Sequence, residues 1–352
     1  MHRYHSHRGD YRLGMTRAKW YRDIPRVGVS RRVSWSETGS VNTDMKLAIP
    51  DLISNSYFTA LAAAELGHFA RHGLDVEAEL IFPVDRAYEA LRDGEVDFVA
   101  GAAHGALAAF PAWRGVKFLG ALAQGMYWFL VMRADLKIAR GDLTALKGRR
   151  IGAAPWVEMG LRRLLIAAGL DLQRDEIAIA PVPGATGTTT NFGLTAAQAL
   201  ADGKIEGFWA NGMATEIAVT SGTGSIVLDV RRGDGPVGCF DYTFGALATT
   251  NRLIETSPDI AAAALRALVD AQADLKADPS RATRVGEKRF PPRETGLIAQ
   301  IVARDLSYYD AAISEKSIAG VVGFARALGI LNQDVEYRDI AATQLSHLWT
   351  RA

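Results

Sequence analysis

Apolar and polar positions repeat with two different periods along most of the chain. Residues 58–69 place apolar side chains at helical spacing, and Gly73 provides a stop. Residues 74–80 then alternate apolar side chains with acidic ones, which predicts a strand with one solvated face. The order strand, helix, strand, helix, strand predicts a parallel sheet, with strands at 46–49, 74–80 and 96–100 and helices at 58–69 and 84–94.

The same order of elements returns further along the chain. The segments LRDGEVD (91–97) and LADGKIE (200–206) are closely similar and hold corresponding places in the two runs. Two copies of one sheet unit predict two similar lobes. In the second copy we expect strands at 150–153, 177–182 and 205–210 and helices at 156–168 and 195–201.

Two continuous apolar segments, 127–133 and 243–249, predict strands where the chain crosses between the lobes. We expect a two-strand hinge, with lobe 1 formed by residues 45–132 and 245–352 and lobe 2 by residues 133–244. The C-terminal part predicts helices with an apolar stripe at 260–275, 294–302, 317–328 and 340–348.

The first 44 residues have a different character. They hold nine Lys or Arg against four acidic residues and show no sustained periodicity, which predicts a disordered extension. Ser30-Arg31-Arg32 resembles the start of a twin-arginine export signal, but a polar segment follows where an apolar one is needed. We therefore expect a cytoplasmic protein, or a periplasmic one if the true start differs or export is non-standard.

Composition narrows the function classes. Acidic and basic residues nearly cancel, to a formal charge of +1, which argues against a nucleic-acid partner. No apolar run approaches the roughly 18 residues of a membrane-spanning helix, so we expect no membrane insertion. Cys239 is the only cysteine, which excludes an intrachain disulfide and a cysteine-rich metal site. We expect neither a metal nor a cofactor.

Four segments carry a family resemblance: AELGHFARHGLDV (64–76), ALRDGEVD (90–97), LKGRRIG (146–152) and ALADGKIEGF (199–208). They resemble the sulfonate/taurine/nitrate solute-binding family, which also includes the thiamine-pyrimidine synthases. The resemblance extends over residues 45–352. It implies an α/β periplasmic-binding-protein type 2 fold, capture of a ligand between the lobes, and delivery to an ABC permease.

In open parallel sheets, small molecules bind beyond the carboxyl ends of the strands. The loops placed there are 51–57, 101–104, 124–128, 154–158 and 210–213. Helix starts after Ser56 and Pro155 favour an anionic ligand group such as a sulfonate or carboxylate. The aromatic candidates favour a flat or apolar ligand body: Tyr57, Tyr127, Trp128, Trp156 and Trp209. The polar candidates are Asn55, Ser56, His104, Gln124, Glu158, Asn211 and Asp241.

Several of these residues also fit a structural role. Trp128 and Trp209 fit core positions at strand ends, and a lone His104 is commonly structural. Glu158 fits either a helix-dipole role or acceptance from a ligand amine, as an aminopyrimidine requires. We expect Trp156 and Trp209 to stack on the ligand from opposite lobes. The segment 183–193 predicts a mobile surface loop.

The sequence thus predicts a solute-binding protein for a sulfonate, a carboxylate or a heteroaromatic molecule such as a pyrimidine. The alternative is a cytoplasmic enzyme on the same scaffold, thiamine-pyrimidine-synthase-like or desulfinase-like. Against this alternative, the sequence contains none of the short motifs that are typical of catalytic sites. The resemblance to the synthases implies a cysteine cluster with a lysine and a histidine, and that to the desulfinases implies a first-loop cysteine. The first loop here has Asn55 and Ser56 instead.

Overall fold

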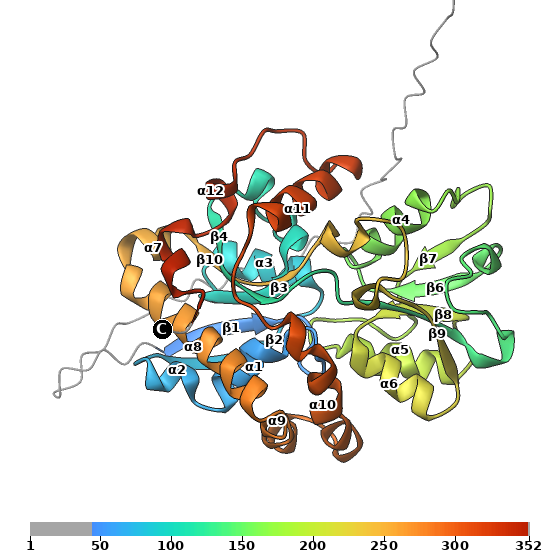
Figure 1. Cartoon of the computed structure of the whole chain (residues 1–352), viewed down its shortest axis with the longest axis horizontal. Coiled ribbons are helices and arrows are strands. Elements are labelled where there is room, and N and C mark those ends of the chain that lie inside the picture. Colours follow the sequence, from blue (N-terminus) through green and yellow to red (C-terminus); the bar gives the residue numbers. More distant parts are fainter. Residues whose placement is uncertain (1–43, 351–352) are drawn as a thin grey trace, which may run out of the picture. The chain divides into compact units, whose positions relative to one another are not determined.

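The computed structural model describes residues 44–350. The extension predicted for residues 1–44 therefore lies outside the described residues, apart from Asp44, which begins the first strand. The described part has two lobes, each built on a five-stranded mixed sheet covered by helices (Figure 1). This is the predicted α/β fold with two parallel-rich sheets. None of the helices between residues 44 and 350 combines the length and apolarity needed to span a membrane.

Lobe 1 carries a sheet with the strand order β2-β1-β3-β10-β4. The strands are β1 (Asp44–Ile49), β2 (Asp75–Leu80), β3 (Phe98–Ala102), β4 (Val116–Ala123) and β10 (Gly245–Thr250). β1 pairs in parallel with β2 and β3, whereas β10 runs antiparallel to β3 and β4. Every residue of β3 is buried, and β2 keeps one wet face, as its alternation predicts.

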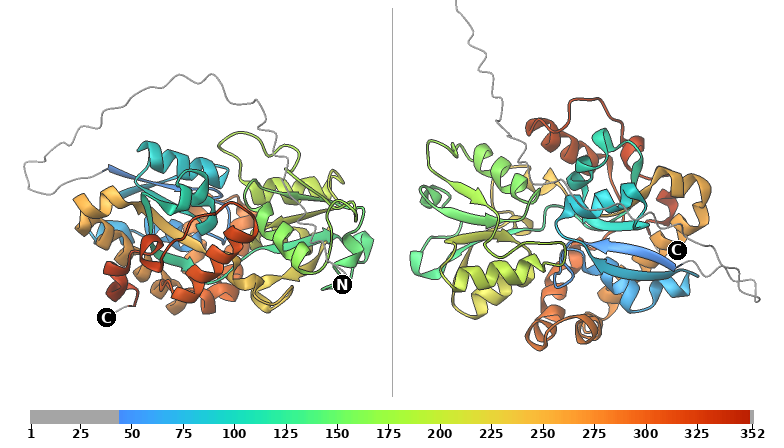
Figure 2. Two further views of the ribbon diagram at one scale, coloured as in Figure 1. Left: turned by 90° about the horizontal axis from the view of Figure 1, so that it is seen from above. Right: turned by 180° about the vertical axis from the view of Figure 1, so that it is seen from behind.

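Helices pack on both faces of this sheet, including most of the C-terminal part of the chain (Figure 2). The predicted helix over 58–69 is interrupted at Gly67, whose φ of +74° is a left-handed conformation that glycine adopts without strain. The expected helix over 340–348 is instead the end of α12 followed by a 3-10 helix, Thr343–Leu348. The helices of lobe 1 are α1 (Phe58–Glu65), α2 (His68–Arg71), α3 (Val84–Asp93), α7 (Asn251–Thr256), α8 (Pro258–Ala277), α9 (Arg281–Arg289), α10 (Pro292–Asp305), α11 (Glu315–Ala327) and α12 (Tyr337–Ile340).

Lobe 2 repeats the plan with the strand order β7-β6-β8-β5-β9. Its strands are β5 (Phe129–Arg133), β6 (Arg150–Ala153), β7 (Ala178–Ala180), β8 (Gly207–Ala210) and β9 (Gly224–Asp229). Its helices are α4 (Glu158–Ala167), α5 (Phe192–Ala201) and α6 (Gly212–Thr220). Both copies of the repeated segment end a helix and turn at a glycine of positive φ, Gly94 in lobe 1 and Gly203 in lobe 2.

The chain passes between the lobes at residues 124–128 and again before β10. The amide of Met126 in the first crossing donates to the carbonyl of Phe240 near the second, at 2.8 Å. The expected boundary between Met132 and Arg133 falls inside β5, which pairs entirely with β8 and β9. Lobe 2 therefore begins a few residues earlier than predicted, because β5 is a strand of its sheet and not a hinge strand.

Candidate functional site

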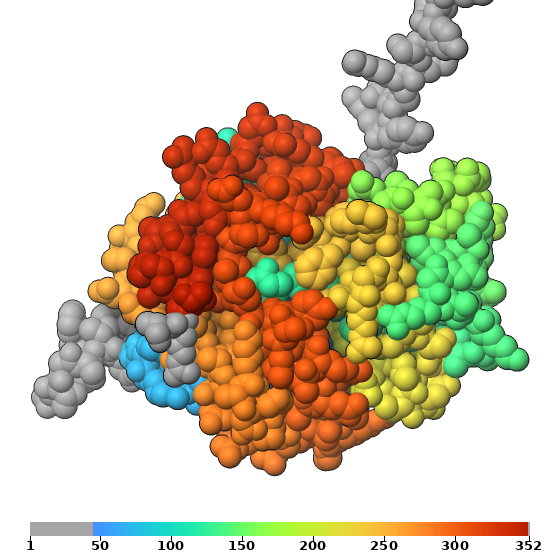
Figure 3. Space-filling model, viewed as in Figure 1, coloured from blue at the N-terminus to red at the C-terminus, as the bar shows by residue number. Residues whose placement is uncertain are grey.

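A cavity of about 30 Å³, the central cavity, lies between the two lobes. Its walls come from the loops that follow β1, β6 and β8 and from the segment 124–128 that connects the lobes. These loops lie at the carboxyl ends of the strands, where a ligand site is expected in an open parallel sheet. A volume of this size admits a water molecule but no organic ligand. The lobes are thus closed on one another, and Figure 3 shows their segments meeting across one face. The lining consists of Pro50, Asp51, Ser54, Ser56, Tyr57, Phe82, Val84, Trp128, Ala154, Val157, Phe192, Ala210 and Asn211.

Asp51 is the charged group of this cavity, and it bonds across the lobe junction. Its Oδ2 accepts from the amide of Gly193 at 2.9 Å and from Nδ2 of Asn211 at 3.0 Å, both in lobe 2. Its Oδ1 is buried and has no hydrogen-bond partner among the described residues. Burial raises the pKa of Asp51 to about 7, against the lowering effect of Gly193, Asn211 and the nearby backbone amide of Ile53. The site therefore contains a carboxyl group that titrates near neutrality and keeps one oxygen free.

The N-termini of two helices in lobe 2 explain why the Asp51 carboxylate is stabilised at the lobe junction. Gly193 lies in the first turn of α5, and Asn211 is the N-cap of α6, where its Oδ1 accepts from the amide of Ala214 at 3.0 Å. The N-terminus of a helix favours negative charge. In the closed protein an internal carboxylate thus occupies the start of α5, where the anionic group of a ligand would otherwise be attracted.

Four aromatic side chains, Tyr57, Phe82, Trp128 and Phe192, form part of the wall of the central cavity. Phe82 of lobe 1 stacks on Phe192 of lobe 2, with ring centroids 5.8 Å apart and an interplanar angle of 14°. Tyr57 meets Tyr127 edge-on at 5.9 Å, and Tyr127 in turn contacts Trp128 at 4.9 Å. The clamp that reaches across the lobes is therefore the Phe82–Phe192 pair.

The expected clamp of Trp156 and Trp209 is wrong. Trp209 lies on β8 and Trp156 follows β6, so both belong to lobe 2 and cannot face each other from opposite lobes. Trp209 is completely buried, and its indole N–H donates to the carbonyl of Val157 at 3.2 Å. The strand-end tryptophan is thus a core residue, which was the alternative interpretation.

His104 is also structural. Its Nε2 lies 3.0 Å from the carbonyl oxygen of Trp156, an acceptor only, so Nε2 carries the proton and donates. Its Nδ1 then accepts from the hydroxyl of Thr243 at 2.9 Å. Complete burial lowers the pKa of His104 to about 4, so the imidazole is neutral. The bond ties lobe 1 to Trp156, which has a φ of +68°, an unusual backbone conformation for a side chain of this size.

The loop before α5 is attached at one point to lobe 1. The amide of Phe82 donates to the carbonyl of Thr188 at 2.8 Å. In the closed protein this contact holds the segment against lobe 1 at Thr188, and the mobility predicted for residues 183–193 stays a prediction. Together with the Phe82–Phe192 stack, the contact makes the segment a cover on one side of the central cavity.

Three other candidates lie away from the central cavity. Glu158, in the first turn of α4, has a buried Oε2 without a partner among the described residues, and burial raises its pKa to about 7. Gln124 donates to the carbonyls of Asp310 and Ala312, at 2.8 Å each. Asp241 forms an ion pair with Lys316 at 3.2 Å. Gln124 and Asp241 line a separate cavity of about 260 Å³ beside the crossings.

Asn55 lines a second cavity and does not line the central one. Its Nδ2 donates to Oδ2 of Asp305 at 2.7 Å, and it lines a polar cavity of about 130 Å³. A Cβ atom on Gly212 would come within 2.9 Å of the Asn55 amide. The absence of a side chain on Gly212 is therefore what lets Asn55 of lobe 1 approach α6 of lobe 2.

The described residues contain no cluster of three or more His, Cys, Asp and Glu side chains that could hold a metal ion. Cys239 lies outside the central cavity, and burial raises the pKa of its thiol to about 11. A thiol with such a pKa is protonated at neutral pH and is a poor nucleophile.

Comparison with known proteins places this geometry in a family. Residues 55–282 match the family model described as NMT1/THI5 like. The chain belongs to the NMT1/THI5-like family. The predicted resemblance to sulfonate and nitrate solute-binding proteins is thereby confirmed. None of the curated protein sequences matches the chain.

Several solved structures share the fold of this NMT1/THI5-like protein. The alkanesulfonate-binding protein SsuA from Xanthomonas axonopodis pv. citri, bound to MOPS, has 14% identity and a TM-score of 0.64, covering 86% of this chain and 97% of its own. The periplasmic nitrate-binding protein NrtA from Synechocystis PCC 6803 has 16% identity and a TM-score of 0.57, covering 72% and 69%. A mutant of DSZB in complex with biphenyl-2-sulfinic acid has 16% identity and a TM-score of 0.59, covering 86% and 98%. At these identities the likeness concerns the fold.

Four of the twelve residues predicted for the site line the central cavity of this NMT1/THI5-like protein: Ser56, Tyr57, Trp128 and Asn211. The sequence analysis missed Asp51, Phe82 and Phe192. Asp51 had a recognisable signal, because it directly follows Pro50 at the carboxyl end of the first strand. Phe82 and Phe192 had none, since their pairing depends on how the two lobes close.

Proposed function

We propose that this protein is a solute-binding protein that closes its lobes around a small heteroaromatic molecule carrying hydrogen-bond donors, such as an aminopyrimidine. The observation that carries the proposal is the free Oδ1 of Asp51 in the wall of the central cavity. Lysine, arginine and histidine are missing from the described residues that line it. The cavity thus offers an acceptor to a ligand and no cation.

Electrostatics favours a donor ligand over an anion. A carboxylate in a buried cavity is stabilised by an N–H donor or a cation and destabilised by a second negative charge. A sulfonate would have to displace Asp51 from Gly193 or lie beside it. An amino group or a protonated ring nitrogen would instead satisfy Oδ1. The unpartnered hydroxyl of Ser56 is a second polar group available to the ligand.

The aromatic wall supports a flat ligand body. Phe82 and Phe192 stack on each other in the closed protein, and Trp128 lies in the same lining. A planar ring inserted between the two phenyl groups would gain offset stacking from both lobes. The cavity of about 30 Å³ has no room for such a ring, so the lobes must separate to admit it.

A solved structure of similar fold supports the proposal that the ligand is captured for transport. One neighbour in fold is named as the ligand-binding component of an ABC-type import system from Staphylococcus aureus. By analogy we propose an ABC permease as the partner that receives the ligand. The ligand chemistry proposed here differs from the sulfonates and nitrate in the names of other neighbours, because Asp51 lines the cavity.

The test is a binding comparison by calorimetry and thermal shift. Probes are 4-aminopyrimidine and benzamidine, which carry donors on a flat ring, against benzenesulfonate and taurine. We expect the first pair to bind and to raise the melting temperature, and Asp51→Asn to weaken their binding at least tenfold. Glu77→Gln, an exposed acid on β2, is the matched control. Binding of the sulfonates alone would contradict the proposal.

One observation favours an enzyme as the second candidate. A carboxyl group with a pKa of about 7 is suited to take a proton from a bound substrate and return it. Mass spectrometry of a bound probe over time distinguishes the two functions. A binding protein releases the probe unchanged, whereas an enzyme converts it and loses that conversion in Asp51→Asn.

A further inference from the structure

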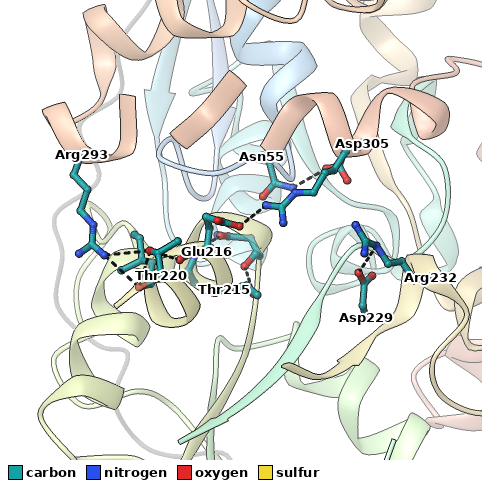
Figure 4. A network of polar contacts seen from close by, with 12 residues as sticks. Asn55, Thr215, Glu216, Thr220, Asp229, Arg232, Arg293 and Asp305 are labelled. Carbon is teal, nitrogen blue, oxygen red and sulfur yellow. Dashed lines mark hydrogen bonds and ion pairs between the residues drawn. The ribbon is translucent and has the colours of Figure 1, made fainter. Parts of the chain in front are cut away.

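The polar cavity behind Asn55 is lined by residues of both lobes. Its volume is about 130 Å³. Lobe 1 contributes Arg304 and Asp305 at the end of α10, and lobe 2 contributes residues of β9 and the turn after it. Figure 4 shows part of this lining together with the contacts between α10 and α6. Its charged residues are the four arginines Arg140, Arg231, Arg232 and Arg304 and the two aspartates Asp229 and Asp305.

Arg231 is the fixed cation of this polar cavity. Its side chain is only 5% exposed and pairs with Asp305 at 3.0 Å. The guanidinium lies over the rings of Tyr308 and Tyr127, at 4.8 Å and 5.6 Å from their centroids. Its Nε is buried and has no hydrogen-bond partner among the described residues. A buried N–H without an acceptor is costly, so this donor points to an acceptor that the chain itself does not supply.

The other three arginines are only partly used by the protein. Arg232 pairs with Asp229 at 3.2 Å, Arg140 with Asp234 at 2.8 Å, and Arg304 with Glu216 at 2.6 Å. Each guanidinium carries five N–H donors, and one carboxylate accepts from two of them at most. Each of the four arginines has one carboxylate partner, and Asp234 and Glu216 lie outside the lining of the cavity. The guanidinium groups therefore carry more N–H donors than these carboxylates accept.

One acceptor in the wall is also free. The Oδ1 of Asn55 is buried without a partner, and its orientation is fixed because Nδ2 donates to Asp305. A protonated oxygen would satisfy Oδ1, and a fully ionised oxyanion would not. The wall therefore combines an excess of guanidinium donors with a single acceptor.

We propose that the polar cavity binds hydrogen phosphate, either as the free ion or as a phosphate group. Guanidinium groups match the oxygens of a tetrahedral oxyanion in geometry and charge. The phosphate hydroxyl donates to Asn55, which distinguishes it from sulfate. Because Arg304 and Asn55 belong to lobe 1 and the other arginines to lobe 2, the bound ion holds the lobes together. It therefore binds the closed state more tightly and shifts the protein toward closure.

The experiment titrates the full chain with inorganic phosphate, sulfate and chloride at equal ionic strength, by calorimetry and thermal shift. We expect saturable binding of phosphate, weaker binding of sulfate, and no effect of chloride. The double variant Arg140→Gln/Arg232→Gln, whose native side chains are 47% and 57% exposed, should fold normally and lose phosphate affinity at least tenfold. Arg174→Gln, which breaks a surface pair with Asp175, is the matched control. An equal response to chloride, or unchanged phosphate affinity in the double variant, would overturn the proposal.

A second arm identifies the source of the phosphate and is independent of the function proposed above. Inorganic phosphate and phenyl phosphate are each titrated into wild type and Asp51→Asn. Binding of inorganic phosphate that persists in Asp51→Asn indicates a free ion in a separate site. Tighter binding of phenyl phosphate that depends on both Asp51 and the arginines indicates a phosphate group on the ligand of the central cavity. Loss of every phosphate response in a folded Asp51→Asn variant would count against a polar cavity that binds by itself.

Discussion

Asp51 couples the chemistry of the central cavity to the stability of the protein. Its carboxyl group is buried at the junction of the lobes, and two donors of lobe 2 compensate one of its oxygens. The protein retains this arrangement although it costs free energy when the group is ionised. A carboxyl group with a raised pKa in a cavity is a candidate functional group, and ligand recognition is the role proposed for it above.

Stability should therefore depend on pH through Asp51. Its pKa in the folded protein, about 7, exceeds its ordinary value of 3.8, so the folded state holds the proton more tightly than the unfolded state does. The free energy of unfolding then falls as pH rises from about 4 to about 7 and levels off above that, with a share of up to ~4 kcal/mol from this group. Urea denaturation of wild type and Asp51→Asn across this range measures that share. A pH dependence that is the same in both proteins would contradict the assignment.

Trp209 and Trp156 should respond differently to truncation. Trp209 is completely buried, so Trp209→Ala should reduce the free energy of unfolding by about 3–5 kcal/mol. Trp156 is only partly buried, and Trp156→Ala should cost less than about half of that. Chemical denaturation of the two variants checks the order. A larger loss for Trp156→Ala would mean that its strained backbone position supports more of the fold than its contacts indicate.

Individual residues were predictable where their role depends on position along a strand or helix. Asn211 was expected at the site because it follows β8, and it is the N-cap of α6 and a partner of Asp51. Trp209, two residues earlier, was misjudged because β8 is buried on both faces. Alternation along a strand therefore could not tell which of its side chains reaches the cavity.

Among the elements, the segment before α5 determines how the central cavity is covered. It contacts lobe 1 through Thr188, and directly after it Phe192, the first residue of α5, stacks on Phe82. Both contacts join the lobes and must break when they separate. The segment therefore reports whether the lobes are open or closed.

Hydrogen exchange should detect this cover. The amides of Phe82 and Gly193 donate across the lobe junction, so they are protected only in the closed state. We expect their exchange to slow when 4-aminopyrimidine is added, while amides of the buried strand β10 stay unchanged as an internal control. Equal exchange with and without a probe that binds would show that the cover does not take part in capture.

Most elements followed from periodicity, and those that did not have a physical reason. β4 is buried at nearly every position, so it shows no alternation, and Gly120 within it weakens the strand pattern. The apolar stripe of α6 is hidden because this helix packs against both α5 and α10. α9 is short and rich in basic residues, and its place depends on packing against α10.

At the scale of the whole molecule, the two lobes are held closed by contacts spread along their junction. Asp51 and Phe82 act at the central cavity, His104 bonds to Trp156, and Arg304 pairs with Glu216 beyond Asn55. The division into two lobes was predictable from the internal repeat. The closed geometry was not, because it depends on side chains that lie far apart in the sequence.

Opening and closing should change the size of the protein in solution. Small-angle scattering should give a smaller radius of gyration with a bound probe than without one, because the ligand-free protein must open to admit a probe and a probe in contact with both lobes then holds them together. The variant Phe82→Ala removes the stack between the lobes and should shift the ligand-free protein further toward the open form. Identical profiles with and without a saturating probe would mean that the cavity binds without hinge motion.

The most direct test of the account is native mass spectrometry of wild type and Asp51→Asn purified under the same conditions, with release and identification of any bound molecule. The account predicts that wild type retains a small heteroaromatic molecule carrying amino or protonated nitrogen donors, and that Asp51→Asn retains at least tenfold less while remaining folded. A sulfonate or carboxylate bound equally to both proteins would contradict recognition by Asp51.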